Sequence, residues 1–334
     1  MVDFHLRNKR ILFFSPKFFE YEMKIKEKLE QMGSTVDFYD ERPSNTFFTK
    51  ALLRIDSKFL TKLVNEYYKS IIDKVKENEY DYIFFIKGES VTIEVLKMLR
   101  ENFQKCKMIL YLWDSVKNIK NIDEKLNCFD EAFTFDIVDA KRFNSLKFRP
   151  LFYLDEYSYQ DSYDNYKYDC CFIGTIHTDR YTLIKKIKND LESRGLNTFF
   201  YMYIPAKQLY YFRKIFNSSF RRTSLDNFHF SPISSQEIRK TILSSRSVLD
   251  IQHPNQNGLT MRTIEMLGMR KKLITTNYNV KEYDFFNEKN IVLIDRSTPV
   301  IEDSFFENKY VTLDGSIYNN YSLEFWIKEV FSLK

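Results

Sequence analysis

Residues 250–277 read DIQHPNQNGLTMRTIEMLGMRKKLITTN, and the fold prediction rests on the pattern they hold. An apolar strand runs into a polar loop, a helix opens at Thr260, and KLITT at 272–276 predicts the next strand. A helix between two apolar strands is typical of a parallel sheet covered on both faces. The stretch therefore predicts an α/β domain.

The same alternation continues on both sides of this stretch. In the second half we expect further strands at 168–174, 198–204, 248–252 and 291–294, and helices at 180–193, 234–245, 260–267 and 322–331. In the first half we expect strands at 10–16, 36–39, 80–86, 107–114, 131–135 and 149–154, and helices at 18–32, 55–76 and 92–102.

Ser234 or Ser235 is placed to cap the helix predicted at 234–245, with Glu237 in the first turn. Gly33, Gly195 and Gly268 fall where helices end, a position that favours the left-handed backbone of glycine.

The length of 334 residues is about twice that of a usual domain and favours two domains. We predict an N-terminal Rossmann-like domain at 1–155 and a linker rich in Tyr and Asp at 156–168. A second Rossmann-like domain is expected at 169–320. The end of the chain, 321–334, is expected to form a helix that packs back toward the first domain. The predicted fold class is α/β, with two doubly wound parallel-sheet domains facing a cleft.

Composition narrows the class of protein. A hydrophobic share of 44% with 29% charged residues indicates a globular chain, and the net charge of +5 suits an anionic partner without demanding nucleic acid. The four cysteines form no CxxC pair, which argues against a zinc site and fits a reducing compartment. The polar N-terminus does not resemble a signal peptide, and no apolar run reaches about 18 residues. We therefore expect a cytoplasmic protein with no metal and no other cofactor.

Ligands of open α/β sheets bind beyond the carboxyl ends of the strands, so the candidate residues lie in loops. Gly258, Leu259 and Thr260 open a helix whose backbone N–H groups and dipole favour an anion such as a diphosphate. Arg262 in the first turn would add charge-assisted hydrogen bonds, and Glu265 would accept the hydroxyls of a ribose. The chain has no GxGxxG and no GxxxxGK[ST], which argues against an ordinary NAD site or P-loop.

This segment resembles the donor-binding region of GT-B glycosyltransferases, in which a Gly-initiated helix holds the diphosphate and a glutamate holds the ribose. More closely, FIGT at 172–175 followed by Arg180 resembles the spore-maturation-protein-B-like glycosyltransferases. The resemblance implies a GT-B fold and a nucleotide-diphosphate sugar as the donor. It also implies that the domain at 1–155 is the acceptor-side domain and that the domain at 169–320 binds the nucleotide sugar. The residues that it implies at the donor are Gly174, Thr175, Arg180, His253, Asn257, Gly258, Leu259, Thr260, Arg262 and Glu265.

One departure from the GT-B pattern concerns the sugar side. Gln256 or Asn257 stands near the position where the largest GT-B families have the first of two glutamates. The donor residues also have structural alternatives. Glu265 is otherwise an exposed helix carboxylate paired with Lys or Arg, and Arg262 is a solvated helix residue. Gly174 and Gly258 are otherwise turn glycines, and His253 is otherwise a structural loop histidine.

The catalytic candidates are two carboxylates at strand ends of the first domain. An inverting GT-B enzyme needs a general base there, and Asp114 and Glu89 each follow a predicted strand. A partly desolvated carboxylate has its pKa raised toward the useful range. The structural alternative for Asp114 is that it caps the turn at Ser115. No cluster of metal ligands stands out, and GT-B enzymes generally work without a metal.

Residues 207–222, KQLYYFRKIFNSSFRR, mix basic and aromatic side chains. With Leu209, Phe212, Phe216 and Phe220 on about one helical face, this segment could dock on an anionic membrane surface. It could also bind nucleic acid by stacking and charge. The interpretation we favour is that the aromatic residues belong to the core beneath a solvated basic face.

The function predicted from the sequence is transfer of a sugar from a nucleotide-diphosphate donor to a hydroxyl of a glycan or lipid-linked acceptor. The setting we expect is bacterial cell-surface polysaccharide or glycoconjugate synthesis, in the cytoplasm or peripherally at the inner face of the membrane. One alternative is a nucleotide-sugar 2-epimerase of the same architecture. Another is a non-catalytic protein that binds nucleotides, glycans or nucleic acid, although a nucleic-acid partner is not expected.

Overall fold

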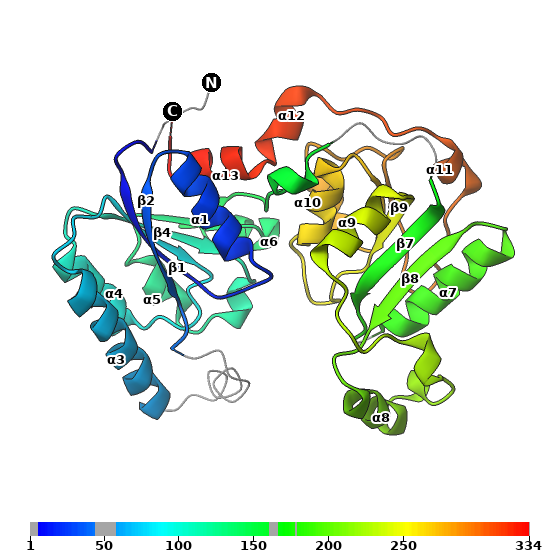
Figure 1. Cartoon of the computed structure of the whole chain (residues 1–334), viewed down its shortest axis with the longest axis horizontal. Helices are drawn as coiled ribbons and strands as arrows, with labels where there is room; N and C mark the ends of the chain where they lie inside the picture. Colours follow the sequence, from blue (N-terminus) through cyan, green and yellow to red (C-terminus); the bar gives the residue numbers. More distant parts are fainter. Residues whose placement is uncertain (1–5, 44–57, 160–165, 178, 334) are drawn as a thin grey trace. The chain divides into compact units, whose positions relative to one another are not determined.

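The computed structural model describes residues 6–43, 58–159, 166–177 and 179–333. The chain divides into two compact units, each built on one parallel β-sheet (Figure 1). Unit 1 comprises Met1–Leu151 and Leu323–Lys334, and unit 2 comprises Phe152–Ser322. The division falls after Leu151, earlier than the predicted boundary at 155. Residues 160–165 of the predicted linker lie outside the described part of the chain.

The sheet of unit 1 has six parallel strands in the order β2-β1-β3-β4-β5-β6. The strands are β1 (Arg10–Ser15), β2 (Thr35–Asp40), β3 (Tyr82–Ile86), β4 (Lys107–Leu112), β5 (Glu131–Thr134) and β6 (Lys147–Phe148). The helices are α1 (Tyr21–Gln31), α3 (Lys58–Val75), α4 (Ile93–Asn102), α5 (Ile122–Leu126), α6 (Ile137–Arg142) and α13 (Leu323–Val330). Residues 55–57 of the predicted helix 55–76 lie outside the described residues.

Helices cover both faces of this sheet, which explains why its central strands β1, β3 and β4 are mostly apolar. Leu12, Phe14 and Phe85 share one core cluster with residues of α3 and α4. Tyr111 lies on the opposite face, where its ring centroid is 4.6 Å from that of Trp326 in α13. Figure 1 shows α3 and α4 on one side of the sheet and α1 and α13 on the other.

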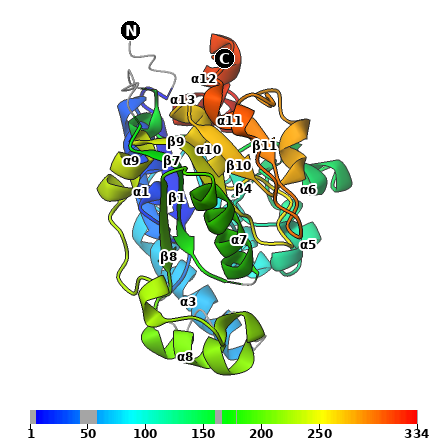
Figure 2. The same cartoon turned by 90° about the vertical axis from the view of Figure 1, so that its right-hand side faces the viewer.

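The sheet of unit 2 has five parallel strands in the order β11-β10-β9-β7-β8. The strands are β7 (Tyr168–Thr175), β8 (Thr198–Tyr203), β9 (Ser245–Asp250), β10 (Lys272–Thr275) and β11 (Ile291–Leu293). The helices are α7 (Arg180–Ser193), α8 (Lys207–Phe216), α9 (Ser235–Leu243), α10 (Met261–Gly268), α11 (Asp303–Glu307) and α12 (Gly315–Asn320). Cys170 and Leu249 pack with α7, while α9 and α10 lie against β9 (Figure 2). None of the helices among the described residues is long and apolar enough to cross a bilayer.

Helix capping follows the sequence closely. Ser234 caps α9 in a capping box with Glu237, as predicted. Gly33 and Gly195 adopt positive φ angles of 99° and 78° after their helices, also as predicted.

Gly268 does not have the predicted left-handed backbone. It is the last residue of α10, and the positive φ of 51° belongs to Arg270. A Cβ at Gly268 would lie 2.5 Å from Cγ of Tyr153 and 2.6 Å from the carbonyl oxygen of Tyr157. The glycine is therefore needed for the close approach of another segment to the helix.

The predicted strand 149–154 is wrong. The last strand of the unit 1 sheet is β6, which ends at Phe148, and Tyr153 forms only an isolated bridge with Ser322. The backbone N–H of Tyr153 donates to the carbonyl of Tyr321 at 2.8 Å. Leu151 and Leu154 are buried, so the apolar run reflects burial without sheet pairing.

The favoured interpretation of 207–222 is correct for only part of the segment. Phe220 and Tyr210 are in the core, but Tyr211, Phe212 and Phe216 are exposed. Helix α8 ends at Phe216, so Phe220 does not continue the predicted helical face. Most of the apolar side chains of the helix therefore face solvent rather than the core.

Candidate functional site

The carboxyl ends of the unit 2 strands bring together most of the residues predicted to bind a donor. β7 ends at Thr175 and β9 at Asp250, and Thr275 of β10 lies opposite Asp250 in the parallel register. Arg180 begins α7 soon after β7, and Thr260 caps α10 after the loop that follows β9. This edge of the sheet therefore carries two helix N-termini and a guanidinium group.

Asp250 is a buried carboxylate that fastens the start of α10 to the sheet. Its Oδ2 accepts hydrogen bonds from the hydroxyls of Thr260 at 2.5 Å and Thr263 at 2.9 Å. The hydroxyl oxygen of Thr260 accepts from the backbone N–H of Thr263 at 3.2 Å, which is an N-cap bond. The helix start is thus held in place at the position where its dipole favours an anion.

Arg180 has surroundings that suit a phosphate ligand. Its Nη1 donates to the carbonyl of Thr175 at 3.0 Å, while its Nε is buried and has no hydrogen-bond partner within the described residues. Burial lowers the pKa of the Arg180 guanidinium, and the charge of Asp250 opposes this. Because a guanidinium remains protonated in proteins, Arg180 is a cation with donor capacity left.

Two histidines lie side by side at this edge. The ring centroids of His177 and His253 are 5.7 Å apart. Burial lowers the pKa of His177 to about 4, and the charge of Arg180 adds to the shift. His177 is therefore neutral at pH 7 and can donate or accept a hydrogen bond. The sequence reasoning missed His177, although it stands two residues after Thr175.

The loop between β9 and α10 is held by side-chain amides. Asn277 Nδ2 donates to the carbonyls of Asn257 at 3.1 Å and Gly258 at 3.2 Å, and Gln256 Nε2 donates to the carbonyl of Gly258 at 3.1 Å. The side chain of Leu259 is buried. Asn257, Gly258 and Leu259 therefore shape the loop through their backbones and packing.

Arg262 and Glu265 form an ion pair within α10. Nη1 of Arg262 is 3.1 Å from Oε2 of Glu265. Glu265 is only 4% exposed, so it is not the exposed helix carboxylate of the structural alternative, although it does pair with an arginine. Burial raises the pKa of the nearby Tyr157, and the charge of Glu265 adds to this. The pair is thus part of a buried polar region between α10 and the segment that contains Tyr157.

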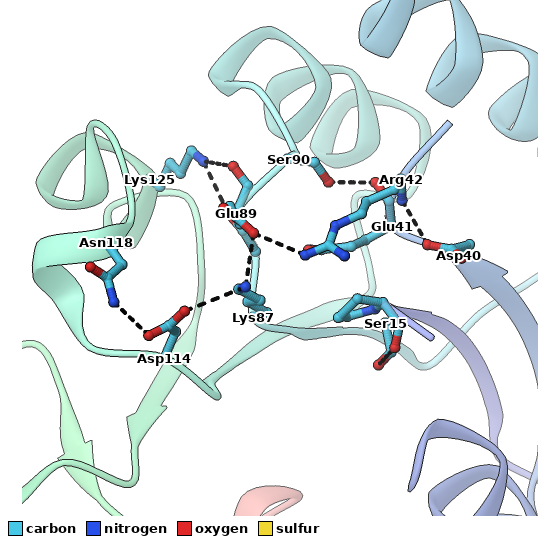
Figure 3. A network of polar contacts seen from close by, with 12 residues as sticks. Ser15, Asp40, Glu41, Arg42, Lys87, Glu89, Ser90, Asp114, Asn118 and Lys125 are labelled. Carbon is cyan, nitrogen blue, oxygen red and sulfur yellow. Dashed lines mark hydrogen bonds and ion pairs between the residues drawn. The ribbon is translucent and has the colours of Figure 1, made fainter. Parts of the chain in front are cut away.

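Figure 3 shows a polar network at the carboxyl ends of the unit 1 strands. Lys87 follows β3 directly and has a left-handed backbone with a φ of 74°. Its Nζ lies 2.9 Å from Oε2 of Glu89 and 3.4 Å from Oδ2 of Asp114. Arg42 Nη2 lies 3.0 Å from the same oxygen of Glu89. Both predicted catalytic carboxylates therefore belong to one network.

The two carboxylates differ in their chemistry. Burial raises the pKa of Glu89, but Lys87 and Arg42 outweigh it and leave the pKa below its ordinary value. A carboxylate held in this way is a weak base. Asp114 accepts hydrogen bonds from the backbone N–H of Ser115 at 2.9 Å and from Asn118 Nδ2 at 2.7 Å, so it also makes the predicted turn contact.

Glu41 is a titratable member of this region that the sequence reasoning missed. It follows β2 and is 0% exposed, and neither oxygen of its carboxylate has a hydrogen-bond partner within the described residues. Burial raises the pKa of Glu41 to about 7, against the opposing charges of Arg42 and Lys87. The available signal was the position of Glu41 just after a predicted strand, where the chain meets the carboxyl edge of the sheet.

Lys125 completes the network from α5. Its Nζ donates to the carbonyls of Gly88 at 3.0 Å and Glu89 at 3.1 Å (Figure 3). Burial lowers the pKa of Lys125 to about 8, with Glu41 acting in the opposite direction. Across the described residues of both units, no three His, Cys, Asp or Glu side chains gather in a way that could hold a metal ion.

Solved structures with the same architecture cover nearly the whole chain. Anabaena Alr3699/HepE in complex with UDP and glucose is 12% identical, with a TM-score of 0.60 and coverage of 97% of this chain and 100% of that one. The chain has the GT-B fold. The GT-B fold class predicted from the sequence, with two parallel-sheet α/β domains, is therefore confirmed.

Two further structures match the fold of this chain at similar identity. The N-terminal domain of Candida albicans trehalose-6-phosphate phosphatase is 11% identical, with a TM-score of 0.58 and coverage of 98% and 97% of the two chains. Methanocaldococcus jannaschii UDP-GlcNAc 2-epimerase, in complex with UDP-GlcNAc and UDP, is 11% identical, with a TM-score of 0.51 and coverage of 97% and 99% of the two chains.

No family model matches the chain, and no curated protein has a matching sequence. The resemblance to the spore-maturation-protein-B-like enzymes thus stays a prediction.

Proposed function

We propose that this GT-B chain is a glycosyltransferase that moves a sugar from a nucleotide-diphosphate donor to a hydroxyl of a glycan or lipid-linked acceptor. The observation that carries the proposal is the meeting of Arg180, the capped start of α10 and the buried Asp250 at one edge of the unit 2 sheet. The likeness of fold to a protein in complex with UDP and glucose supports it. We further propose that the chain acts in bacterial cell-surface polysaccharide or glycoconjugate synthesis.

The donor would be held by charge and by helix N-termini rather than by a metal. Arg180 offers a buried cation with an unused donor, and the first turn of α10 offers backbone N–H groups next to Thr260. Arg262 holds Oε2 of Glu265, which orients the carboxylate that we propose for the ribose hydroxyls. A fixed carboxylate loses less freedom on binding than a mobile one, which favours this arrangement.

In unit 1 we propose Asp114 as the general base and Glu89 as the counter-ion that positions Lys87. Asp114 is partly exposed, with 34% of its side chain accessible, and is therefore within reach of a hydroxyl. Glu89 instead neutralises Lys87 and Arg42, and its lowered pKa makes it a weak proton acceptor. The four cysteines are free, and this supports a reducing compartment such as the cytoplasm as the place of action.

Thermal unfolding in the presence of UDP, GDP, CMP and dTDP tests the proposal, with and without a chelator. A nucleotide present at 100 times its dissociation constant stabilises the native state by about 2.7 kcal/mol, which is a visible shift in the unfolding midpoint. We expect one nucleotide to stabilise the chain and the chelator to have no effect. Failure of all four nucleotides would contradict the proposal.

A nucleotide-sugar 2-epimerase is the second candidate function, because the Methanocaldococcus jannaschii 2-epimerase shares the fold. The two reactions differ in what they release. With a nucleotide sugar and no acceptor, an epimerase yields a second nucleotide sugar that differs from the first in configuration at C2. A glycosyltransferase releases free nucleotide, slowly without acceptor and faster with one. Proton NMR of the incubated donor separates these outcomes.

A further inference from the structure

The most unusual surface of unit 2 is the outer face of α8. Tyr211, Phe212, Ile215 and Phe216 are 52%, 57%, 66% and 71% exposed. Spacings of four residues place them on one face of the helix, and the rings of Phe212 and Phe216 pack at a centroid distance of 4.6 Å. A contiguous apolar face of this kind marks an interaction site, whereas single exposed apolar residues do not. We call these four residues the α8 face.

The helix is anchored firmly enough to present this face. On its other side Tyr210 is buried, and its hydroxyl donates to the carbonyl of Thr223 at 2.9 Å. Lys214 Nζ donates to the same carbonyl at 3.1 Å. Arg213 donates to the carbonyl of Ile176 and lies over the ring of Phe220, 5.7 Å from its centroid. The exposed face is therefore a feature of a packed helix and not of a loose segment.

The charged residues of the segment that carries the α8 face are all basic. Residues 207–222 contain five basic residues and no acidic residue. The whole chain has 51 Lys and Arg against 46 Asp and Glu, so the rest of the chain has 46 of each, and this one segment accounts for the net charge of +5. Lys207, Arg221 and Arg222 are exposed, whereas Arg213 and Lys214 are partly buried in the contacts above.

We propose that the α8 face docks on the surface of an anionic lipid bilayer. Phe212, Ile215 and Phe216 would enter the interface, and Lys207, Arg221 and Arg222 would pair with lipid headgroups. This combination of an apolar face and flanking cations is what interfacial helices use. An RNA would gain from stacking on the aromatic rings but not from burying Ile215, which favours the bilayer.

Helix α8 lies at the edge of the unit 2 sheet that carries the candidate donor residues, so docking would affect where the proposed reaction takes place. α8 follows β8, so it lies beyond the same carboxyl edge of the sheet as the candidate donor residues (Figure 2). Ile176, which accepts the hydrogen bond from Arg213, is the neighbour of Thr175. Docking would bring this edge close to the membrane, as a lipid-linked acceptor requires. The docking itself goes beyond the proposed function and does not depend on it.

Co-sedimentation of the full chain with lipid vesicles tests the inference. We expect binding to vesicles of phosphatidylcholine mixed with phosphatidylglycerol, and at least about tenfold weaker binding to phosphatidylcholine alone. The double substitution Phe212→Ser/Ile215→Ser and the double substitution Arg221→Glu/Arg222→Glu should each reduce binding about tenfold or more. Tyr278→Ser/Val300→Ser removes two exposed apolar residues elsewhere in unit 2 and should leave binding unchanged.

Three results would overturn the inference. The first is equal sedimentation with both kinds of vesicle or with neither. The second is loss of binding in the control variant to the same extent as in the α8 variants. The third is evidence that the α8 face binds another partner. In that case the native chain would form concentration-dependent dimers or bind RNA, and Phe212→Ser/Ile215→Ser would abolish this association but leave vesicle binding intact. Thermal unfolding midpoints of the α8 variants that match that of the native chain, measured without nucleotide, show that the variants are folded, so this test does not depend on the test of the proposed function.

Discussion

The hydroxyl of Thr260 donates to Oδ2 of Asp250 at 2.5 Å and so joins the first turn of α10 to the last residue of β9. The bond links two parts of the proposed anion site, which lie ten residues apart in the sequence. Asp250 gives the loop a fixed end, and Thr260 gives the helix its cap. The position of the helix start then depends on one buried carboxylate.

Replacing Thr260 by Ala should destabilise the chain by about 1–3 kcal/mol, because both the N-cap bond and the bond to a carboxylate are lost. Thr260→Ser keeps the hydroxyl and should cost less than half as much. Urea denaturation followed by circular dichroism measures both. Equal stabilities for the Ala and Ser variants would show that the hydroxyl contributes nothing.

Gly268→Ala should cost about 1–3 kcal/mol or more, because its Cβ would lie 2.5 Å from Tyr153. Gly315→Ala is the matched control. It is also a helical glycine, but an added Cβ there meets no atom within 4 Å, and alanine should stabilise that helix slightly. Thermal unfolding of both variants checks this contrast. A neutral Gly268→Ala would mean that the segment around Tyr153 moves aside at little cost.

Glu41 predicts a pH dependence of stability. Because its pKa is raised from 4.5 to about 7, the folded chain holds this proton more tightly than the unfolded chain. The free energy of unfolding therefore loses up to about 3 kcal/mol through this group as the pH rises from 4.5 to 7.5. Glu41→Gln removes this loss, so the variant should gain stability relative to the native chain over that range. Urea denaturation at a series of pH values measures the difference.

The control for this pH series is Glu79→Gln, which removes an exposed carboxylate of the same unit. The plots of unfolding free energy against pH should differ in shape between the two variants. Of these two glutamates, Glu41 is the one shielded from solvent and without a hydrogen-bond partner among the described residues. A Glu41→Gln curve that runs parallel to that of the native chain from pH 4.5 to 7.5 would contradict the assignment.

The ion pair of Arg262 and Glu265 should show coupling in a double-mutant cycle. Because Glu265 is buried, either single substitution to Ala leaves a partner in a poorly solvated place, and we expect a coupling free energy of about 1–3 kcal/mol. Lys24 and Glu27 form an exposed pair with the same spacing in α1, and the coupling there should be about 0.5 kcal/mol or less. Similar values for the two pairs would contradict the burial argument.

The sequence predicted the fold because local and global signals agree in it. The strand RILFFS has a continuous apolar run, ILFF, in its centre, which is what a sheet covered on both faces requires. Ser234 and Glu237 form the predicted cap, since that pattern needs only residues three apart. The same is true of the start of α10 at Thr260. These signals are short-range and can be recognised without a structure.

The errors came from features that depend on distant contacts. The apolar run at 149–154 is buried, but burial does not show whether a neighbouring strand is present. Gly268 is required by Tyr153 and Tyr157, more than a hundred residues earlier in the chain. The apolar residues of α8 have the spacing of a helix that packs on a core. Only the structure shows that Tyr210 is the one buried residue of this helix.

The candidate site was predicted in part for the same reason. Arg180 and Thr260 follow strands, so the rule about carboxyl ends was enough to find them. Glu41 and His177 also follow strands, but their altered pKa values depend on burial, which a sequence does not give. The pairing of Arg262 with Glu265 was foreseen as an alternative, whereas its burial was not.

The central claim is that the carboxyl edge of the unit 2 sheet binds the donor nucleotide. Isothermal titration calorimetry tests it most directly, with the nucleotide that stabilises the chain in thermal unfolding. The native chain is compared with the Arg180→Ala and Arg194→Ala variants. Arg194 is a guanidinium at the other end of α7 and serves as the matched control. We predict that Arg180→Ala weakens binding about tenfold or more, as the loss of a charge-assisted hydrogen bond implies, and that Arg194→Ala leaves the dissociation constant unchanged. The same dissociation constant for all three proteins would contradict a donor site at the carboxyl edge of unit 2.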